Sequence, residues 1–365
     1  MSVNEYYTLG RSGLRVSRLA LGTMTFRNKA WGNDDDVARE LLARYLDRGG
    51  NFIDTADVYG GGGSETLLGE LIAERQVRGK IVLATKFTHN GDRGNPNASG
   101  NGRVNILRAV EASLRRLRTD YLDLYLLHNW DLVTPVEEVV RTLDDLVTQG
   151  KVRHVGLSDV PAWYASRGQT IAELRGYEPF CTLQLEYSLL QRDIEHEFTR
   201  LATDHGMGIM VWSPLASGML SGKYRPGEQG AQGRLATMKG AGGNLFDKMR
   251  EQHFAVVAEL QKVAKAAGRS MAQVAINWIA NRPGVGSVVL GATRVEQLED
   301  TLQSLDFTLP AELSNRLEEA TRPPPRFPYI FFSGSVQDMI LAGATVGDKP
   351  AGYTVPHLIR PPKKQ

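Results

Sequence analysis

The chain has 365 residues, and its 43 Lys and Arg against 41 Asp and Glu give a formal net charge of +2. A hydrophobic share of 42% and a charged share of 23% are ordinary for a globular protein and exclude a disordered or fibrous chain, and the small net charge gives no field to hold a nucleic acid or an anionic membrane. The single cysteine, Cys181, excludes an internal disulfide framework, and without a signal-peptide pattern or a long apolar run we expect a cytoplasmic protein with no membrane partner.

The predicted elements begin with an N-terminal hairpin, indicated by the turn signals Gly10 and Ser12-Gly13. Beyond it, short apolar runs alternate with longer segments of helical period. The apolar runs predict strands at residues 19–21, 51–54, 81–85, 122–127, 152–157, 182–185, 208–212 and 287–290. The helical periods predict helices at residues 34–48, 65–74, 104–117, 135–149, 161–174, 194–205, 270–281 and 295–304.

This alternation predicts one α/β domain over residues 1–365, a (β/α)8 TIM barrel with an N-terminal hairpin. A doubly wound sheet would carry a Gly-rich phosphate turn after its first strand, whereas here that strand runs into Leu21-Gly22-Thr23-Met24. We expect the barrel over about residues 17–320 and an extended C-terminal tail over residues 322–365. Two further segments depart from the alternation: a polar excursion at residues 89–103 and a long loop at residues 213–250, after the seventh strand.

Four reactive side chains follow the carboxyl ends of predicted strands: Asp54 and Tyr59 after the second, Lys86 after the third and His128 after the fourth. In a barrel these ends meet at one mouth. An ammonium beside a phenol favours the phenolate and makes the phenol a better acid. A carboxylate can hold that ammonium, while an imidazole can hydrogen-bond to a carbonyl oxygen. Together the four side chains predict a device that delivers a proton to a substrate.

Three of these residues also have a structural interpretation, and Tyr59 alone would indicate nothing. Asp54 could cap the helix near Ser64, Lys86 could be a solvated strand end, and His128 could be a core histidine with its hydrogen bonds satisfied. Their placement at successive strand ends is what favours the catalytic interpretation.

Other chemistries have less support. The seven histidines form no H-x-H or H-E-x-x-H pair, so we predict no metal site. Ser64 follows four glycines and is not in a nucleophile elbow; we expect it to cap the helix that opens at Glu65. The basic run at residues 115–118 is expected to be a solvated helix end.

The sequence resembles the aldo/keto reductases over roughly residues 6 to 320. The segment Asn51-Phe52-Ile53-Asp54-Thr55-Ala56-Asp57-Val58-Tyr59-Gly60, followed by Lys86 and His128, is similar to the family's Asp-Tyr-Lys-His tetrad. Three further segments resemble the aryl-alcohol-dehydrogenase-like branch. They are Arg93-Gly94-Asn95-Pro96-Asn97, Gly156-Leu157-Ser158-Asp159-Val160-Pro161-Ala162-Trp163 and Trp212-Ser213-Pro214-Leu215-Ala216-Ser217-Gly218.

The resemblance implies an NAD(P)H-dependent enzyme that reduces an aldehyde or ketone to an alcohol, with hydride from nicotinamide C4. It implies that Tyr59 is the general acid, that Lys86 promotes its acidity, that Asp54 fixes Lys86 and that His128 orients the carbonyl group. NADPH is the expected cofactor, with NADH possible, and a small carbonyl compound is the expected substrate.

The resemblance also implies a set of cofactor-binding residues. At the nicotinamide end, Ser158, Asp159 and Gln184 hold the carboxamide and Trp212 stacks on the ring, although Trp212 could instead be a core aromatic. Asp159 stands where the wider family commonly has Asn. Ser213, Leu215, Gly218 and Lys223 correspond to the family's phosphate strap, where glycine lets the backbone approach the pyrophosphate closely. The full set of cofactor residues is Gly22, Thr23, Met24, Asp54, Ser158, Asp159, Gln184, Trp212, Ser213, Leu215, Gly218, Lys223, Gly291, Thr293, Arg294, Gln297 and Asp300.

At the adenine end, Arg294 is the expected partner of the 2′-phosphate, because its fork can bind a phosphate with two hydrogen bonds. It could also be a solvent-facing first-turn arginine. Asp300 and Thr301 replace a frequent Glu and Asn of the family, which is why NADH stays possible.

An apolar substrate pocket is predicted from aromatic residues in the loops that follow the strands, with plain loop packing as the alternative. Besides Tyr59 and His128, the predicted substrate residues are Phe26, Trp31, Phe87 and Trp130. Phe327, Tyr329 and Phe331 of the tail could close this pocket.

Two classes of function are therefore compatible with the sequence. One is a carbonyl reductase that favours aromatic or medium-chain aldehydes. The other is a cofactor-binding regulatory subunit of low turnover, similar to the family's potassium-channel β subunits. A barrel isomerase or metal hydrolase would lack its ligands and leave the cofactor motifs without a role. The sequence leaves monomer and homo-oligomer both open.

Overall fold

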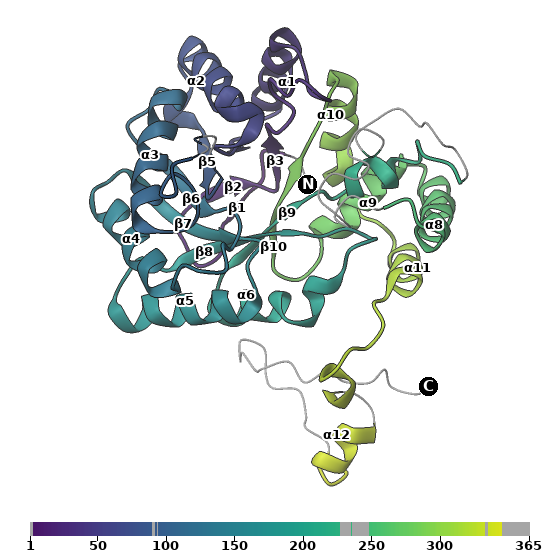
Figure 1. Ribbon diagram of the computed structural model, residues 1–365. Helices are drawn as coiled ribbons and strands as arrows, with labels where there is room; N and C mark the ends of the chain where they lie inside the picture. The colour runs from purple at the N-terminus through teal and green to yellow at the C-terminus, as the bar shows by residue number, and fades with distance from the viewer. Residues whose placement is uncertain are drawn as a thin grey trace. The chain divides into compact units, whose positions relative to one another are not determined.

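The computed structural model describes residues 3–89, 92, 94–226, 235, 248–332 and 335–344. The contacts divide the chain into two compact units, Met1–Thr321 and Arg322–Gln365. The first contains the barrel (Figure 1). Much of the predicted long loop, at 227–234 and 236–247, lies outside the described residues, as do Arg93 and residues 345–365 of the tail.

The predicted hairpin is confirmed by two antiparallel strands, β1 (Tyr6–Thr8) and β2 (Arg15–Ser17). Leu9, between them, and Val16 on β2 are fully buried and pack with the side chains of the barrel interior. The Arg11 backbone N–H donates to the Gly206 carbonyl at 2.7 Å. Gly10 has φ +60°, and a Cβ there would lie 2.4 Å from the Cys181 carbonyl oxygen. The hairpin is therefore fitted closely to one end of the barrel.

The eight predicted strands are confirmed and close into a parallel barrel of order β10-β3-β4-β5-β6-β7-β8-β9. Their apolar runs are buried on both faces, which is why they read as nearly continuous. The strands are β3 (Leu19–Gly22), β4 (Phe52–Asp54), β5 (Val82–Phe87), β6 (Leu122–Leu127), β7 (Val152–Ser158), β8 (Phe180–Glu186), β9 (Gly208–Trp212) and β10 (Val285–Leu290).

The helices lie outside the strands in Figure 1. The predicted ones are found as α1 (Asp35–Asp47), α2 (Gly63–Arg75), α3 (Arg103–Leu117), α4 (Val136–Thr148), α5 (Ala162–Arg175), α6 (Phe198–His205), α9 (Met271–Ala280) and α10 (Val295–Leu302). The predicted helix at 194–205 begins instead as a short 3-10 helix, η3 (Asp193–His196). Three helices of the described residues were not predicted: α8 (Glu251–Ala267), α11 (Ala311–Thr321) and the short α12 (Ser335–Ile340) in the predicted extended tail.

The apolar core has two layers. The larger lies between the barrel and the helices and the smaller lies inside the barrel, where Leu9 and Val16 of the hairpin join side chains of the strands. This filled interior leaves the C-terminal ends of the strands as the place for a site. The second unit includes η7 (Tyr329–Phe332) and α12 (Ser335–Ile340). Within the described part of the chain, no helix combines the length and apolar character needed to cross a membrane.

Candidate active site

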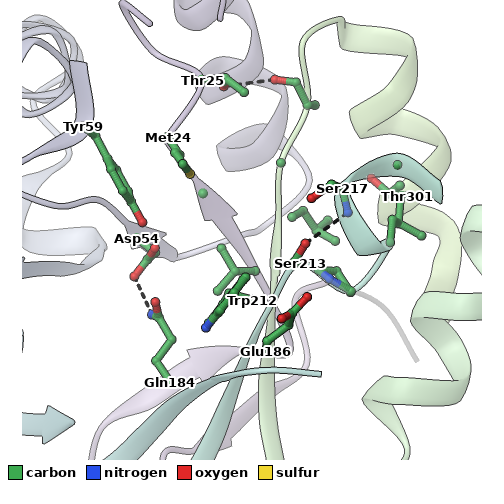
Figure 2. A pocket seen from close by; sticks show the side chains of 18 of the residues that line it. Met24, Thr25, Asp54, Tyr59, Gln184, Glu186, Trp212, Ser213, Ser217 and Thr301 are labelled. Atoms are coloured by element: carbon green, nitrogen blue, oxygen red, sulfur yellow. Dashed lines mark hydrogen bonds between the residues drawn. The ribbon is translucent and has the colours of Figure 1, made fainter. Parts of the chain in front are cut away.

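A cavity of about 1330 Å³ opens at the C-terminal ends of the strands. It extends from Tyr59 and His128 at one end to Gln297 and Thr301 of α10 at the other. Figure 2 shows Asp54, Gln184 and Trp212, from three different strands, together beside this space. The barrel thus brings together side chains that are far apart in the sequence.

Three of the predicted catalytic residues form one hydrogen-bonded chain. Lys86, at the end of β5, is fully buried, and its Nζ donates to Asp54 Oδ2 at 2.8 Å and to Tyr59 Oη at 3.2 Å. The Thr55 carbonyl accepts a further bond from this ammonium at 2.9 Å. Tyr59 begins a 3-10 helix, η1 (Tyr59–Gly62), and lines the cavity. A buried ammonium therefore stands directly behind a phenol that faces the open space.

The charge of Lys86 is maintained by its partners. Burial acts to lower the pKa of this ammonium, but the Asp54 carboxylate and the Tyr59 hydroxyl outweigh it, and the pKa is raised overall. Gln184 Nε2 donates to the other carboxylate oxygen, Asp54 Oδ1, at 2.7 Å. Both oxygens of Asp54 are thereby fixed, and Lys86 stays protonated at neutral pH.

The two capping interpretations near Asp54 are wrong. Asp54 pairs with Lys86, and α2 follows Gly62 with no side-chain cap. The Ser64 hydroxyl instead donates to the Thr23 carbonyl at 2.8 Å, and it also contacts the hydroxyl of Thr55. Ser64 therefore ties α2 to the ends of β3 and β4 rather than capping its own helix.

His128 follows β6 at the wall of the cavity, edge-to-face with the Tyr59 ring at 5.9 Å between centroids. Its Nδ1 is buried and has no hydrogen-bond partner among the described residues, so the prediction of a satisfied core histidine is wrong. Burial, together with the charges of Lys86 and His89, lowers the pKa of His128 well below its usual value. The imidazole is therefore neutral at physiological pH, with one N–H to donate.

Two polar neighbours of His128 were not predicted from the sequence. His89 lies 5.1 Å from His128 between ring centroids, and its Nε2 is 2.7 Å from Asn129 Oδ1. Both residues line the cavity. The sequence holds a usable signal, because each lies two residues after the end of a strand: His89 after β5, which carries Lys86, and Asn129 after β6, next to His128.

The residues predicted for the nicotinamide end of the cofactor lie at the ends of β7, β8 and β9. Trp212 Nε1 donates to Asp159 Oδ1 at 3.1 Å, and the Ser158 hydroxyl lies 3.4 Å from Asp159 Oδ2. Burial, with a contribution from the nearby Glu186 carboxylate, raises the pKa of Asp159 to about 7. Ser158, Asp159, Gln184 and Trp212 all line the cavity. The structure thus places this predicted group together.

The predicted phosphate strap is a short 3-10 segment, η4 (Ala216–Ser221), after β9. The Ser213 hydroxyl accepts a bond from the Ser217 backbone N–H at 3.1 Å, as Figure 2 shows. Gly218 has φ +91°, and a Cβ there would meet Lys223 Cε at 2.8 Å. Ser213, Leu215, Gly218 and Lys223 line the cavity. Glu186 is an unpredicted lining residue, and it forms an ion pair with Lys248 at 2.9 Å.

The adenine-end residues are only partly brought together. Gly291, Thr293, Gln297 and Asp300 line the cavity, whereas Arg294 precedes α10, is exposed and lies outside the lining. Asp300 was predicted as a direct cofactor contact. Its carboxylate is already engaged by the Ser270 hydroxyl and by Gln273 Nε2, each at 2.8 Å, which ties α10 to the start of α9.

The remaining cofactor residues are near the start of the barrel. Gly22, Met24 and Asp54 line the cavity, while Thr23 is fully buried outside the lining and its hydroxyl donates to the Asp54 carbonyl at 3.1 Å. Thr23 faces away from the cavity while Gly22 and Met24 line it, as the alternation of side chains along a strand end would predict.

The predicted aromatic pocket is largely dispersed. Trp31 lines the cavity, but Phe26 and Phe87 are fully buried in the core outside the lining, and Phe87 packs on Tyr125. Trp130 lies against Trp163, with 5.4 Å between ring centroids, also outside the lining. For these three residues loop and core packing is the observed state. The tail aromatics belong to the second unit.

A buried carboxylate supports the wall of the site from behind. Glu65 of α2 is fully buried and accepts bonds from the Thr85 hydroxyl and from Arg116 Nε, each at 2.6 Å. The prediction of a solvated helix end is therefore wrong for Arg116. Its neighbour Arg118, by contrast, is exposed, and the ion pair of Arg118 with Glu70 is long, at 3.5 Å.

The residues present fit a nicotinamide dinucleotide. Amide, hydroxyl and carboxyl groups near Trp212 suit a carboxamide, Gly218 and Lys223 suit a pyrophosphate, and Gln297 lies at the far end of one continuous cavity. His128 Nδ1 is a further buried polar atom without a protein partner among the described residues.

The sequence also matches known proteins. The model of the aldo/keto reductase family matches residues 18–322. A norsolorinic acid reductase of Emericella nidulans is 35% identical over 335 residues, covering 89% of this chain and 84% of that protein. An aryl-alcohol dehydrogenase of Pestalotiopsis microspora is 33% identical, with coverage of 89% and 85%. A probable voltage-gated potassium channel subunit beta of Oryza sativa is 35% identical, with coverage of 88% and 98%.

Proposed function

Because the chain belongs to the aldo/keto reductase family and is an NAD(P)H-dependent oxidoreductase, we propose that it reduces aldehydes or ketones to alcohols with NADPH. The observation that carries this proposal is the buried Lys86 ammonium between Asp54 and Tyr59 at the mouth of the barrel. This arrangement supplies a proton where a carbonyl oxygen gains negative charge.

NADPH, when bound, supplies the hydride. The Tyr59 hydroxyl then donates its proton to the carbonyl oxygen, and the Lys86 ammonium stabilises the phenolate that this leaves. Asp54 keeps Lys86 in place and charged, because their ion pair is buried and only 2.8 Å long. His128, held neutral, offers its N–H to the same carbonyl oxygen and orients the substrate.

The cofactor assignment follows the cavity from end to end. Ser158, Asp159 and Gln184 would hold the carboxamide, with Trp212 against the ring, and the segment from Ser213 to Lys223 would hold the pyrophosphate. The expected substrates carry an aromatic or medium-length apolar group. Trp31 on the cavity wall supports this, and the similarity to an aryl-alcohol dehydrogenase supports an aromatic one.

The test of the catalytic group is Tyr59→Phe. We expect kcat for 4-nitrobenzaldehyde to fall at least ~100-fold, the scale of a lost general acid. Affinity for NADPH, measured by quenching of tryptophan fluorescence, should stay within about three-fold of the original. Turnover that survives the substitution would remove Tyr59 from the mechanism.

The test of cofactor preference is Arg294→Ala. If Arg294 binds the 2′-phosphate, Kd for NADPH should rise about ten-fold or more, as expected for a lost charge-assisted pair, while Kd for NADH stays unchanged. Its exposed position makes the experiment informative, because equal changes for both cofactors would assign it to the solvated surface.

A second candidate function, a cofactor-binding regulatory subunit, is favoured by one observation, the similarity to a potassium channel subunit beta over 88% of the chain. The two functions differ in turnover. Tight NADPH binding without oxidation of the cofactor across a panel of aromatic and aliphatic aldehydes would support the regulatory subunit.

A further inference from the structure

Asp159 occupies a constrained position on the wall of the cavity. It directly follows β7 with φ +46°, a left-handed conformation that few residues other than glycine, Asn and Asp adopt readily. Its backbone N–H donates to the Gln184 carbonyl at 3.3 Å. The carboxyl group is held by the Trp212 indole at 3.1 Å and lies 3.4 Å from the Ser158 hydroxyl. Backbone and side chain together fix where this carboxyl group sits.

The carboxylates around Asp159 have cationic partners. Asp54 pairs with Lys86 at 2.8 Å, and Glu186 pairs with Lys248 at 2.9 Å. Among the described residues, Asp159 itself belongs to no ion pair; its hydrogen-bond donors, Trp212 and Ser158, are neutral. An ionised Asp159 therefore adds a negative charge that no ion pair within the described part of the chain neutralises.

The groups that act on this carboxyl come from four strands. From β8, the Glu186 carboxylate disfavours ionisation, and from β5 the Lys86 ammonium favours it. The indole of β9 and the hydroxyl of β7 stabilise the ionised form by hydrogen bonds. Burial is the largest influence, and the resulting pKa of about 7 puts the change of charge within the physiological range.

The two redox forms of the cofactor differ by one charge in the nicotinamide ring, which is positive in NADP⁺ and neutral in NADPH. On the function proposed above, that ring lies at Trp212, beside Asp159. We infer that Asp159 makes the preference of this site for oxidised or reduced cofactor depend on pH. Its ionised form favours NADP⁺ and its protonated form favours NADPH. Binding of NADP⁺ then releases a proton from Asp159.

The experiment measures Kd for NADP⁺ and for NADPH separately between pH 5.5 and 8.5 at constant ionic strength, by quenching of tryptophan fluorescence. The ratio of the two constants cancels the titration of the 2′-phosphate, which both forms share. We expect Kd(NADP⁺)/Kd(NADPH) to fall at least ~10-fold from low to high pH. Two unit charges a few ångströms apart at an effective dielectric constant of about 20 allow an effect of this size or larger.

Asp159→Asn is the matched variant, because it keeps the shape and cannot ionise. Its ratio should be independent of pH. Glu186→Gln removes the carboxylate that disfavours ionisation, so the midpoint of the pH dependence should move to lower pH with the amplitude retained. Circular dichroism of each variant would establish that it is folded.

The outcomes separate this inference from the function on which it rests. If the unmodified protein binds both forms but the ratio does not change with pH, or if Asp159→Asn keeps the same dependence, Asp159 does not set the preference. If neither form binds at all, the proposed function is itself wrong, and the inference is overturned with it.

Discussion

Removing the negative charge of Asp54 should destabilise the protein strongly. Lys86 is fully buried, and Asp54→Asn would leave its ammonium with only the Thr55 carbonyl, the Tyr59 hydroxyl and a neutral amide. Breaking a buried ion pair from one side costs about 3–5 kcal/mol, because the remaining charge is uncompensated. Domains of 150–250 residues lose about 2–4 °C of Tm per kcal/mol, so we expect Tm to fall by roughly 5 °C or more.

The double variant Asp54→Asn/Lys86→Met separates stability from catalysis. It removes both charges, and uncharged replacements of a buried pair are often neutral or stabilising. We therefore expect the double variant to recover most of the lost Tm. Turnover should stay low, because Tyr59 no longer has an ammonium behind it.

The assay is thermal unfolding at pH 7 without cofactor, monitored by tryptophan fluorescence. It compares the unmodified protein, Asp54→Asn, Lys86→Met and the double variant. Aldehyde turnover is measured on the same preparations. The reasoning fails if Asp54→Asn lowers Tm by less than about 1 °C. It also fails if the double variant is as unstable as Asp54→Asn, because the charge would then not be the cause.

Two further predictions concern buried groups away from the cavity. Arg116→Met leaves the buried Glu65 carboxylate without its cation, so the free energy of unfolding, measured in urea, should fall by ~3 kcal/mol. The control, Arg118→Met at an exposed position, should lower it by at most ~0.5 kcal/mol. Equal losses of stability would contradict a special role for Arg116. Burial raises the pKa of the Cys181 thiol to about 12, so at pH 8 a thiol reagent should label it only after unfolding in guanidinium; rapid labelling of the folded protein would be inconsistent with its position inside the barrel.

The barrel was predictable because its signals are local. Each strand is a short apolar run, and Asp54, Lys86 and His128 stand at strand ends that this topology must bring to one mouth. The unpredicted helices carry weaker signals: α8 follows a Gly-rich segment, α11 has Leu317 as its one buried residue, and α12 is only six residues long.

The predictions that were wrong concern the direction in which a side chain points, toward the cavity or toward the core. Phe26 and Trp130 follow strands as predicted, whereas Phe87 is the last residue of β5 itself. The two phenylalanines are fully buried in the core, and Trp130 packs on Trp163. An aromatic ring gains as much free energy from the core as from a pocket wall, so composition cannot decide between them. The prediction that Arg116 is solvated was wrong because its partner, Glu65, is 51 residues away in the sequence, and no local pattern indicates the pairing.

The hairpin at the closed end of the barrel has a consequence for where the domain can be cut. The family model begins at residue 18, but Leu9 and Val16 precede it and fill the barrel interior from that end. A protein shortened to residues 18–322 would lack the hairpin that covers this end of the barrel. The apolar side chains inside the barrel would then be exposed to water. We therefore expect the smallest folding unit to be larger than the region matched by the family model, because it includes the hairpin that precedes residue 18.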